Sequence, residues 1–450
     1  MLYVGIDVGG TKIQASRVEE SGTVVGRQRV ATPREGGAEA VLAAIDGVVD
    51  DVLDSGGEES VTPAAIGVAI PGVVDPSAAR VVVTPNMNLT GVEIGAHLEK
   101  RFRVPVAVGN DCNLGTLGER WLGSARRAGS AMGIFVGTGI GGGFVRKGKL
   151  WRGARETAGE VGHMIMEVGG PECGCGNRGC LEALASRAAV ERRLRAAIDA
   201  GESTILTDLL DDLSVIRSSA IRKALDQQDP LVTREMHRAA ELLGYACVSI
   251  RHLLDPEVII LGGGVVEACS RFIMPIVERV VAADRLPGAR ETGGVLLSTL
   301  GDDAVVLGAV ALARQTVGRS PFKRRYAVSP EYPSLEAVRP GVVRVGGRTF
   351  DRDVYVFASG KVRKRKRRHY DPATASAHRV GPREIERLCA GGPEVVFVAA
   401  GQGGQVELSD EATRFLERRA IDLTSLPTAE AVEAFNRCKQ RKAALIHVSC

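Results

Sequence analysis

Residues 1–12, MLYVGIDVGGTK, decide the fold of the first part of the chain. The apolar, β-branched run LYVGIDV ends directly in two glycines, which is typical of a buried strand followed by a tight turn. Two further runs end in the same way, IFVGTGIGGG at 134–143 and VIILGGGV at 258–265. Helical periodicity fills stretches between such runs, as in AEAVLAAIDGVVDDVLDS at 38–55. The alternation predicts an α/β fold.

The glycine turns that follow these strands are suited to phosphate binding. Glycine adopts positive φ and lets backbone N–H groups approach an anion closely. A single such turn is a weak indication, because it can equally be a plain tight turn, but three in one chain are much stronger. The first turn also has Asp7 before it and Thr11 and Lys12 after it, which supplies a carboxylate to hold Mg²⁺ through water and a hydroxyl for phosphate. It matches neither the Walker pattern nor GxGxxG.

A histidine and three cysteines stand close together within EVGHMIMEVGGPECGCGNRGCLE at 160–182. His163, Cys173, Cys175 and Cys180 follow the spacing H-x9-C-x-C-x4-C, which supplies the four ligands of a closed, structural Zn²⁺ site. The alternatives are disulfides or unliganded loop thiols. The chain opens without a basic region and an apolar run, so we expect no secretory signal and a reducing, cytoplasmic compartment. Clustered cysteines there are more often metal ligands.

Composition and charge indicate more than one domain. The 450 residues are 44% hydrophobic and 25% charged, an ordinary globular mixture, and no apolar run is long enough to predict a transmembrane helix. Residues 320–450 hold 24 Lys and Arg against 15 Asp and Glu, or +9, whereas residues 1–319 hold 34 against 39, or −5. Prolines among polar and basic residues mark the change. We therefore expect domains at 1–316 and 341–450, joined by a linker at 317–340.

Seven motifs follow one another within the first domain: DVGGTK at 7–12, PGVVD at 71–75, GNDCN at 109–113, GTGIGGG at 137–143, GEVGH at 159–163, CGCGNRGCLE at 173–182 and LGGGVV at 261–266. In type and order they resemble the motifs of the ROK sugar kinases (repressor, open reading frame, kinase). The resemblance covers roughly residues 1–316. It implies an actin-like ATPase fold, in which two α/β lobes, each a mixed sheet with helices, close on a sugar and a nucleotide.

The resemblance makes Asp111 the catalytic base, and its position in the sequence agrees. Asp111 follows the apolar run PVAVGN, so it is expected at the carboxyl end of a strand, where α/β proteins place ligands. A sugar hydroxyl is a poor nucleophile at neutral pH and needs a carboxylate to accept its proton as the phosphoryl group transfers. The alternative is that Asp111 only caps the following helix.

Other site residues are carried over from the same family. Planar amides and carboxylates bind adjacent sugar hydroxyls in pairs, and the family places Asn110, Glu160 and Glu182 there with Asp111. One ring nitrogen of His163 would bind Zn²⁺ while the other bonds a sugar hydroxyl. The ATP site, whose turns could alternatively be plain turn geometry, is expected at Asp7, Gly9, Gly10, Thr11, Lys12, Thr138, Gly139, Gly262, Gly263 and Gly264.

The wording of two segments, CGCGNRGCLEALAS at 173–186 and TPNMNLTG at 84–91, looks most like the bacterial glucokinase branch. We therefore expect ATP- and Mg²⁺-dependent phosphorylation of a hexose, D-glucose first, at its 6-hydroxyl. Mannose, fructose and N-acetylhexosamines remain alternative substrates, and a non-catalytic sugar sensor is the alternative class. Family repressors carry an N-terminal helix-turn-helix, which we do not expect here because the phosphate motif begins the chain. By resemblance the chain forms dimers or tetramers.

The C-terminal residues predict a small α/β domain of strands, a hairpin and helices, ending on a strand. GKVRKRK at 360–366, VVFVAAGQGGQVELS at 395–409, LPTAEAVEAFN at 426–436 and KAALIHVSC at 442–450 resemble the domain found in mitochondrial complex I assembly factors and adipogenesis-associated proteins. This resemblance implies a fold and leaves the function open.

The run KVRKRKRRH at 361–369 contains seven Lys or Arg residues, and such runs can bind nucleic acid through their charge. The run lacks interleaved aromatic residues for base stacking and follows a Ser359-Gly360 turn. A charged strand is therefore the preferred interpretation, and nucleic acid is not expected as a partner. The GQGGQ segment at 401–405 has two interpretations, an anion-binding turn or a plain strand-ending turn.

Overall fold

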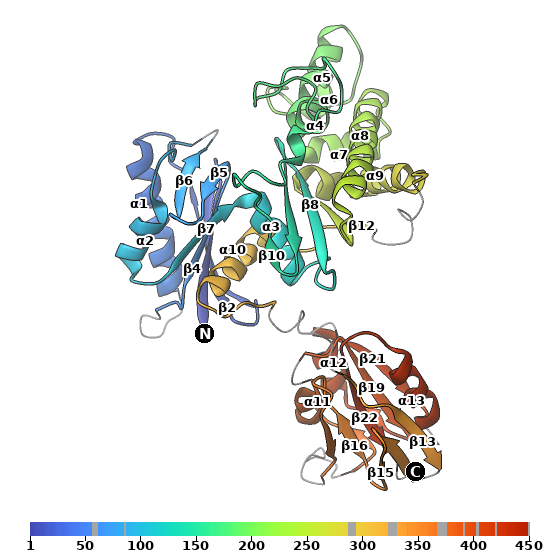
Figure 1. The fold of residues 1–450 in the computed structure, drawn as a ribbon. Helices are drawn as coiled ribbons and strands as arrows, with labels where there is room; N and C mark the ends of the chain where they lie inside the picture. Colours follow the sequence, from blue (N-terminus) through green and yellow to red (C-terminus); the bar gives the residue numbers. More distant parts are fainter. Residues whose placement is uncertain are drawn as a thin grey trace. The chain divides into compact units, whose positions relative to one another are not determined.

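The computed structural model of the chain falls into two compact units, Met1–Phe322 and Lys323–Cys450, which are described separately (Figure 1). Among the described residues, no helix is both long and apolar enough to cross a membrane. The described residues are 1–55, 62–84, 87–286, 294–322, 331–339, 341–366, 376–389, 392–401, 405–418 and 421–448.

The first lobe of the Met1–Phe322 unit is a five-stranded mixed sheet in the order β3-β2-β1-β4-β7. Side chains alternate across β1, so Ile6 packs into the core beneath α1 while Gly5 faces α10 on the other side. The strands are β1 (Leu2–Val8), β2 (Lys12–Glu19), β3 (Val24–Ala31), β4 (Ile66–Ile70) and β7 (Val106–Asn110), with the hairpin β5 (Val73–Asp75) and β6 (Arg80–Val83) and the helices α1 (Gly37–Asp54) and α2 (Ile94–Phe102).

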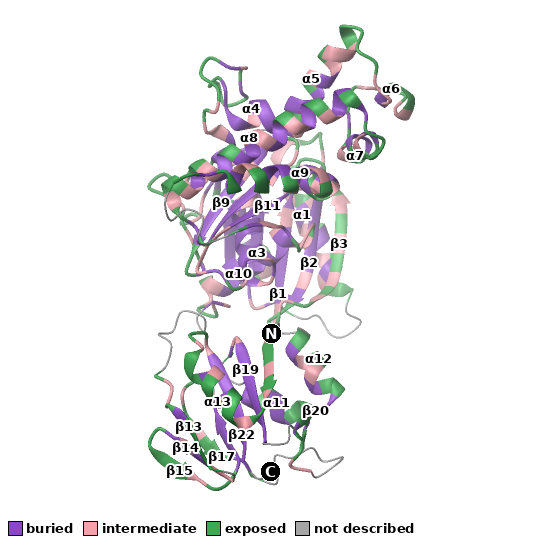
Figure 2. Ribbon diagram, turned by 90° about the vertical axis from the view of Figure 1, so that its right-hand side faces the viewer, coloured by how far each residue is buried: buried purple, intermediate pink, exposed green. Residues whose placement is uncertain are grey.

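The second lobe repeats this plan with the strand order β10-β9-β8-β11-β12. Its central strands are buried, as the purple ribbon of Figure 2 shows for β9 and β11, because helices cover both faces. Its elements are β8 (Ser130–Val136), β9 (Ile140–Arg146), β10 (Lys149–Leu150), β11 (Val258–Gly262), β12 (Val295–Leu297), a short 3-10 helix (Val161–His163), α4 (Leu181–Ala185), α5 (Arg187–Asp199), α6 (Leu206–Leu209), α7 (Ser218–Asp226), α8 (Pro230–Leu254) and α9 (Gly264–Ala282).

Two helices connect the lobes and cross each other at backbone contact. α3 (Asp111–Trp121) leads from β7 to β8, and α10 (Asp303–Thr316) leads from β12 back onto the first sheet. A Cβ atom on Gly118 would lie 2.0 Å from the carbonyl oxygen of Ala304, and one on Gly308 would lie 1.7 Å from that of Leu114. Only glycine allows this approach, so the crossing depends on both positions.

The Lys323–Cys450 unit is a five-stranded sheet, β17-β16-β22-β19-β21, between two layers. α13 and a small antiparallel sheet cover one face, and α11 and α12 cover the other. The elements are β13 (Leu335–Arg339), β14 (Val342–Val345), β15 (Arg348–Phe350), β16 (Val354–Val356), β17 (Val362–Lys364), β18 (Arg379–Val380), β19 (Val395–Ala400), β20 (Glu407–Leu408), β21 (Asp422–Leu426), β22 (Lys442–His447), α11 (Pro382–Leu388), α12 (Asp410–Arg418) and α13 (Thr428–Arg437).

The local predictions agree with these elements. The three runs that end in glycine are β1, β8 with the start of β9, and β11, and the helical stretch at 38–55 is α1. The predicted hairpin is β16 and β17, joined through Gly360, whose φ of 77° suits the turn. The final strand is β22. Parts of the glucokinase-like segment at 84–91, of the basic run and of the GQGGQ segment lie outside the described residues.

Candidate active site

The end of β7 and the start of α3 position Asn110 and Asp111. Asn110 caps α3, since its Oδ1 accepts a hydrogen bond from the backbone N–H of Asn113 at 3.0 Å, and its Nδ2 donates to the carbonyl of Gly72 at 3.0 Å. Asp111 is the first residue of the helix, and its Oδ1 accepts from the N–H of Cys112 at 2.8 Å. The helix cap is therefore Asn110 and not Asp111. Asp111 follows directly after β7, at the carboxyl end of that strand, as predicted.

Burial raises the pKa of both central carboxylic acids. Asp7, near the end of β1, has its pKa raised to about 6 by burial and by the nearby charge of Asp111. Burial likewise raises the pKa of Asp111, against the hydrogen bond from Cys112. Within the described residues, neither Asp7 nor Asp111 forms an ion pair with a basic side chain. Two partly buried acids near one another that form no ion pair among these residues favour a bound cation or a donated proton.

Two carboxylates of the second lobe, Glu160 and Glu182, lie near Asp111. Burial raises the pKa of Glu160, and the charges of Asp111 and Glu182 add to this shift while His163 opposes it. Oε2 of Glu182 accepts from the backbone N–H of Ile140 at 2.8 Å. This contact requires Gly139, because a Cβ atom there would lie 2.3 Å from that oxygen.

The four predicted zinc ligands converge. Their ligand atoms all lie within 4.8 Å of one another, with Nδ1 of His163 3.7 Å from Sγ of Cys173, and Sγ of Cys175 3.7 Å from Sγ of Cys180. Ligands on ~2.3 Å bonds around a tetrahedral ion lie about 3.7 Å apart, so the donors fit Zn²⁺. Sγ of Cys173 is also 3.8 Å from Oε1 of Glu182, which joins the cluster to the carboxylates.

The predicted nucleotide residues lie on three turns. Gly9, Gly10 and Thr11 form the turn between β1 and β2, closed by a hydrogen bond from Gly9 N–H to the carbonyl of Lys12 at 2.9 Å. At the end of β11, Gly263 has a φ of 88° and begins α9 with Gly264. All these groups are placed at strand ends, as expected.

Two charged residues at these turns were missed by sequence reasoning. Asp302 lies 3.4 Å from Nζ of Lys12 and 3.1 Å from Arg29, and these cations hold the pKa of Asp302 below its usual value although burial opposes the shift. Arg187 donates to Oγ1 of Thr138 at 2.7 Å. Asp302 is 290 residues from Lys12 in sequence, so no local pattern could have indicated the pair.

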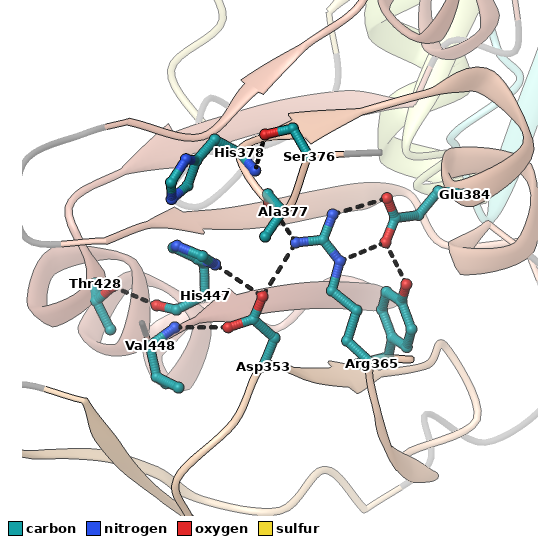
Figure 3. A network of polar contacts seen from close by, with 10 residues as sticks. Asp353, Arg365, Ser376, Ala377, His378, Glu384, Thr428, His447 and Val448 are labelled. Carbon is teal, nitrogen blue, oxygen red and sulfur yellow. Dashed lines mark hydrogen bonds and ion pairs between the residues drawn. The ribbon is translucent and has the colours of Figure 1, made fainter. Parts of the chain in front are cut away.

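The Lys323–Cys450 unit contains a buried network around Arg365, shown in Figure 3. Its guanidinium donates to both oxygens of Glu384, at 2.7 and 2.9 Å, and to Oδ2 of Asp353 at 3.1 Å. Nδ1 of His447 lies 2.7 Å from the same Oδ2, and the hydroxyl of Tyr355 donates to Glu384. Each of these side chains is at least nine-tenths buried.

This network changes the interpretation of the basic run. Arg365 is a structural residue with two carboxylate partners, whereas Lys361, Arg363 and Lys364 are exposed on and beside β17. The preferred prediction of a charged strand is confirmed for residues 362–364. Residues 367–369 of the run lie outside the described part.

Comparisons with known proteins match the two compact units to two different families. The model of the ROK family matches residues 3–316, and that of a family of proteins of unknown function, DUF498/DUF598, matches residues 335–447. The glucokinase of Thermotoga maritima is 33% identical over 316 residues, which cover 70% of this chain and 98% of the relative. The DNA-binding transcriptional dual regulator NagC of Escherichia coli is 29% identical over 253 residues, covering 56% of this chain and 61% of the regulator.

Among solved structures, a ROK family glucokinase from Streptomyces griseus in complex with glucose and AMPPNP aligns with a TM-score of 0.61 and 33% identity. The alignment covers 70% of this chain and 100% of that structure. The expected actin-like ATPase fold is thereby confirmed for the first unit, with a separate C-terminal domain of strands and helices. The family match, the identity and the shared fold together show that this chain belongs to the ROK family.

Proposed function

We propose that this protein transfers the γ-phosphoryl group of ATP to the 6-hydroxyl of a hexose, with D-glucose as the preferred substrate. The observation that carries the proposal is Asp111, a carboxylate with a raised pKa at the start of α3, beside Asp7 and the carboxylates of the second lobe. The glucokinase relatives support the choice of sugar.

In the proposed reaction, Asp111 accepts the proton of the sugar hydroxyl as that oxygen bonds to the γ-phosphorus and ADP leaves. Its raised pKa favours this step, because a base is most effective when its pKa lies near the working pH. Asn110, Glu160 and Glu182 would orient the ring, and orientation of the two reactants supplies a large part of such an acceleration.

The nucleotide would lie along the glycine turns. Lys12 and Thr11 would bind phosphate oxygens, and Asp7 would hold the hydration shell of Mg²⁺, which offsets the charge of the transferring phosphoryl group. The pairing of Lys12 with Asp302 is exposed, so it costs little to exchange for a phosphate contact.

Zinc is proposed as a structural ion held by His163 and the three cysteines. Removing it with a chelator should lower glucose affinity about 10- to 100-fold, because the ion fixes the ring of His163 and, through Cys173, the surroundings of Glu182. Metal analysis and glucose titration of the chelated and Zn²⁺-restored protein would test this. Unchanged affinity after complete metal loss would contradict it.

The proposed function is tested by measuring ADP formation with glucose, mannose, fructose, N-acetylglucosamine and N-acetylmannosamine. Turnover highest on glucose supports the proposal, and turnover highest on another sugar assigns that substrate instead. Binding of glucose without any turnover would favour the sugar-sensing alternative, which the similarity to NagC makes worth testing. Light scattering of the same sample would test the expected dimer or tetramer.

A further inference from the structure

The carboxylate of Glu119 lies fully buried at the place where both connecting helices meet the second lobe. It belongs to α3, two turns from Asp111. Its Oε1 accepts hydrogen bonds from the hydroxyl of Ser298 at 2.7 Å and from the backbone N–H groups of Thr299 and Leu300, both at 2.9 Å. These residues form the segment between β12 and α10, which is about 180 residues away in sequence.

The other oxygen, Oε2, holds the chain that follows α3. It accepts from the N–H of Ser124 at 2.8 Å and from its hydroxyl at 3.0 Å, and also from the hydroxyl of Thr299 at 3.5 Å. One carboxylate thus joins the two chain segments by which the second lobe is attached. The hydrogen bonds all come from neutral donors, and a buried carboxylate depends on such donors for its stability.

The segment held by Glu119 continues directly to the nucleotide side. Asp302 lies beyond Leu300 and pairs with Lys12 and Arg29, and Asp303 pairs with Arg27. Contacts therefore run from α3, which carries the proposed base at its first turn, to the strand that carries the proposed phosphate contact.

We propose that Glu119 is a positioning residue that holds the two connecting segments together. The lobes then close about one shared pivot, and Asp111 and Lys12 keep their positions relative to each other. In this proposal the pivot is the close approach of α3 and α10 at Gly118 and Gly308. Misplacement by about 1 Å in such a site costs on the order of 100-fold in rate. This inference rests on the proposed kinase function.

The test compares Glu119→Gln, Ser298→Ala and Ser124→Ala with Ser55→Ala in the full chain. Ser298→Ala and Ser124→Ala each remove one hydroxyl donor from the carboxylate of Glu119, one from each segment. The hydroxyl of Ser55 instead donates to the carbonyl of Val52 at the end of α1. We expect kcat to fall about 10- to 100-fold in the first three variants, with the KM for glucose changed less than about threefold. Ser55→Ala should match the wild type.

A second measurement detects closure of the two lobes and does not depend on turnover. Trp121 ends α3 and the chain has only two tryptophans, so a Trp151→Phe background isolates its fluorescence. Glucose with AMPPNP should change this signal in the Ser55→Ala control and much less in Ser298→Ala, provided that both melt like the parent.

The inference is overturned if folded Ser298→Ala keeps wild-type kcat and the full fluorescence change, whatever Glu119→Gln does. If the parent turns over no sugar, the proposed function fails by itself, and the fluorescence comparison still decides the role of Glu119. No ligand-induced change in the parent would also overturn the inference, because there would be no closure to position.

Discussion

In the Met1–Phe322 unit, Asp7 and Asp111 lie close enough for their charges to interact and form no ion pair with any residue that the structure describes, whereas in the Lys323–Cys450 unit Asp353 and Glu384 share Arg365. Asp7 and Asp111 are partly buried, whereas Asp353 and Glu384 are buried, and the pKa of Asp7 is raised while that of Asp353 is lowered. For Asp353, burial opposes the shift, and the hydrogen bonds from His447, Val448 and Arg365 outweigh it.

The difference shows that the partners of a buried acid distinguish a candidate binding site from a structural network. A buried acid without a counter-ion destabilises the folded chain when it ionises, and it persists where a ligand supplies the missing partner. A buried acid whose partners are all within the protein is stable by itself and has no capacity left for a ligand. This contrast supports the proposed site at Asp7 and Asp111, and it makes the Arg365 network part of the core of the second unit.

The largest effect should come from removing the proposed base. Asp111→Asn keeps the size of the side chain but cannot accept the proton, so kcat should fall about 10²- to 10⁴-fold. The protein should remain folded, because the substitution removes a buried charge. Initial rates together with a thermal melt would check both parts. Near-normal turnover by Asp111→Asn would show that another group is the base.

The second largest effect should come from removing Arg365, the cation shared by Asp353 and Glu384. Arg365→Ala leaves Glu384 and Asp353 buried without their cation and should destabilise the second unit by about 3–5 kcal/mol. Hydrogen exchange of β16 and β22 in the full chain would measure this. Arg363→Ala, an exposed change on β17 two residues before Arg365, is the matched control and should stay within about 0.5 kcal/mol of the parent. Equal exchange in both variants would contradict the structural role of Arg365.

The smallest effect is on the pH dependence of stability. Asp7 has a folded pKa of about 6 and an unfolded pKa near 3.9, so its ionisation costs stability above pH 6, and the cost disappears as the pH falls toward 4. Asp7→Asn should therefore stabilise the first unit by about 1–3 kcal/mol at pH 7 and by nothing below about pH 4.

Asp353 has the opposite sign, since its folded pKa is lowered. Its contribution is complete above the unfolded pKa and is lost only as the pH falls further, through the folded pKa. Hydrogen exchange of both units between pH 4 and 7 would compare them. If the stabilisation by Asp7→Asn did not change with pH, the pKa of Asp7 would be the same in the folded and the unfolded chain.

Local sequence predicted where several candidate site residues lie and little of what joins them. Asp111 and the four candidate zinc ligands follow short patterns, because a strand end and a tight turn bring them into place over short stretches of sequence. Glu119 and Asp302 gave no such signal, since their partners arrive from about 180 and 290 residues away. Arg365 sits among six other cations, and only its contacts with Glu384 and Asp353 distinguish it.

The amide of Asn110 is oriented from both ends, with its oxygen turned to Asn113 N–H and its nitrogen to Gly72. It cannot flip without losing both bonds, so in the proposed site it would present a fixed polarity to an incoming hydroxyl group. A deoxy sugar lacking that hydroxyl would leave the amide unmatched, and sites of this kind reject such analogues strongly. In the proposed site, the cap of a helix would thus also limit which stereoisomers of a sugar are recognised.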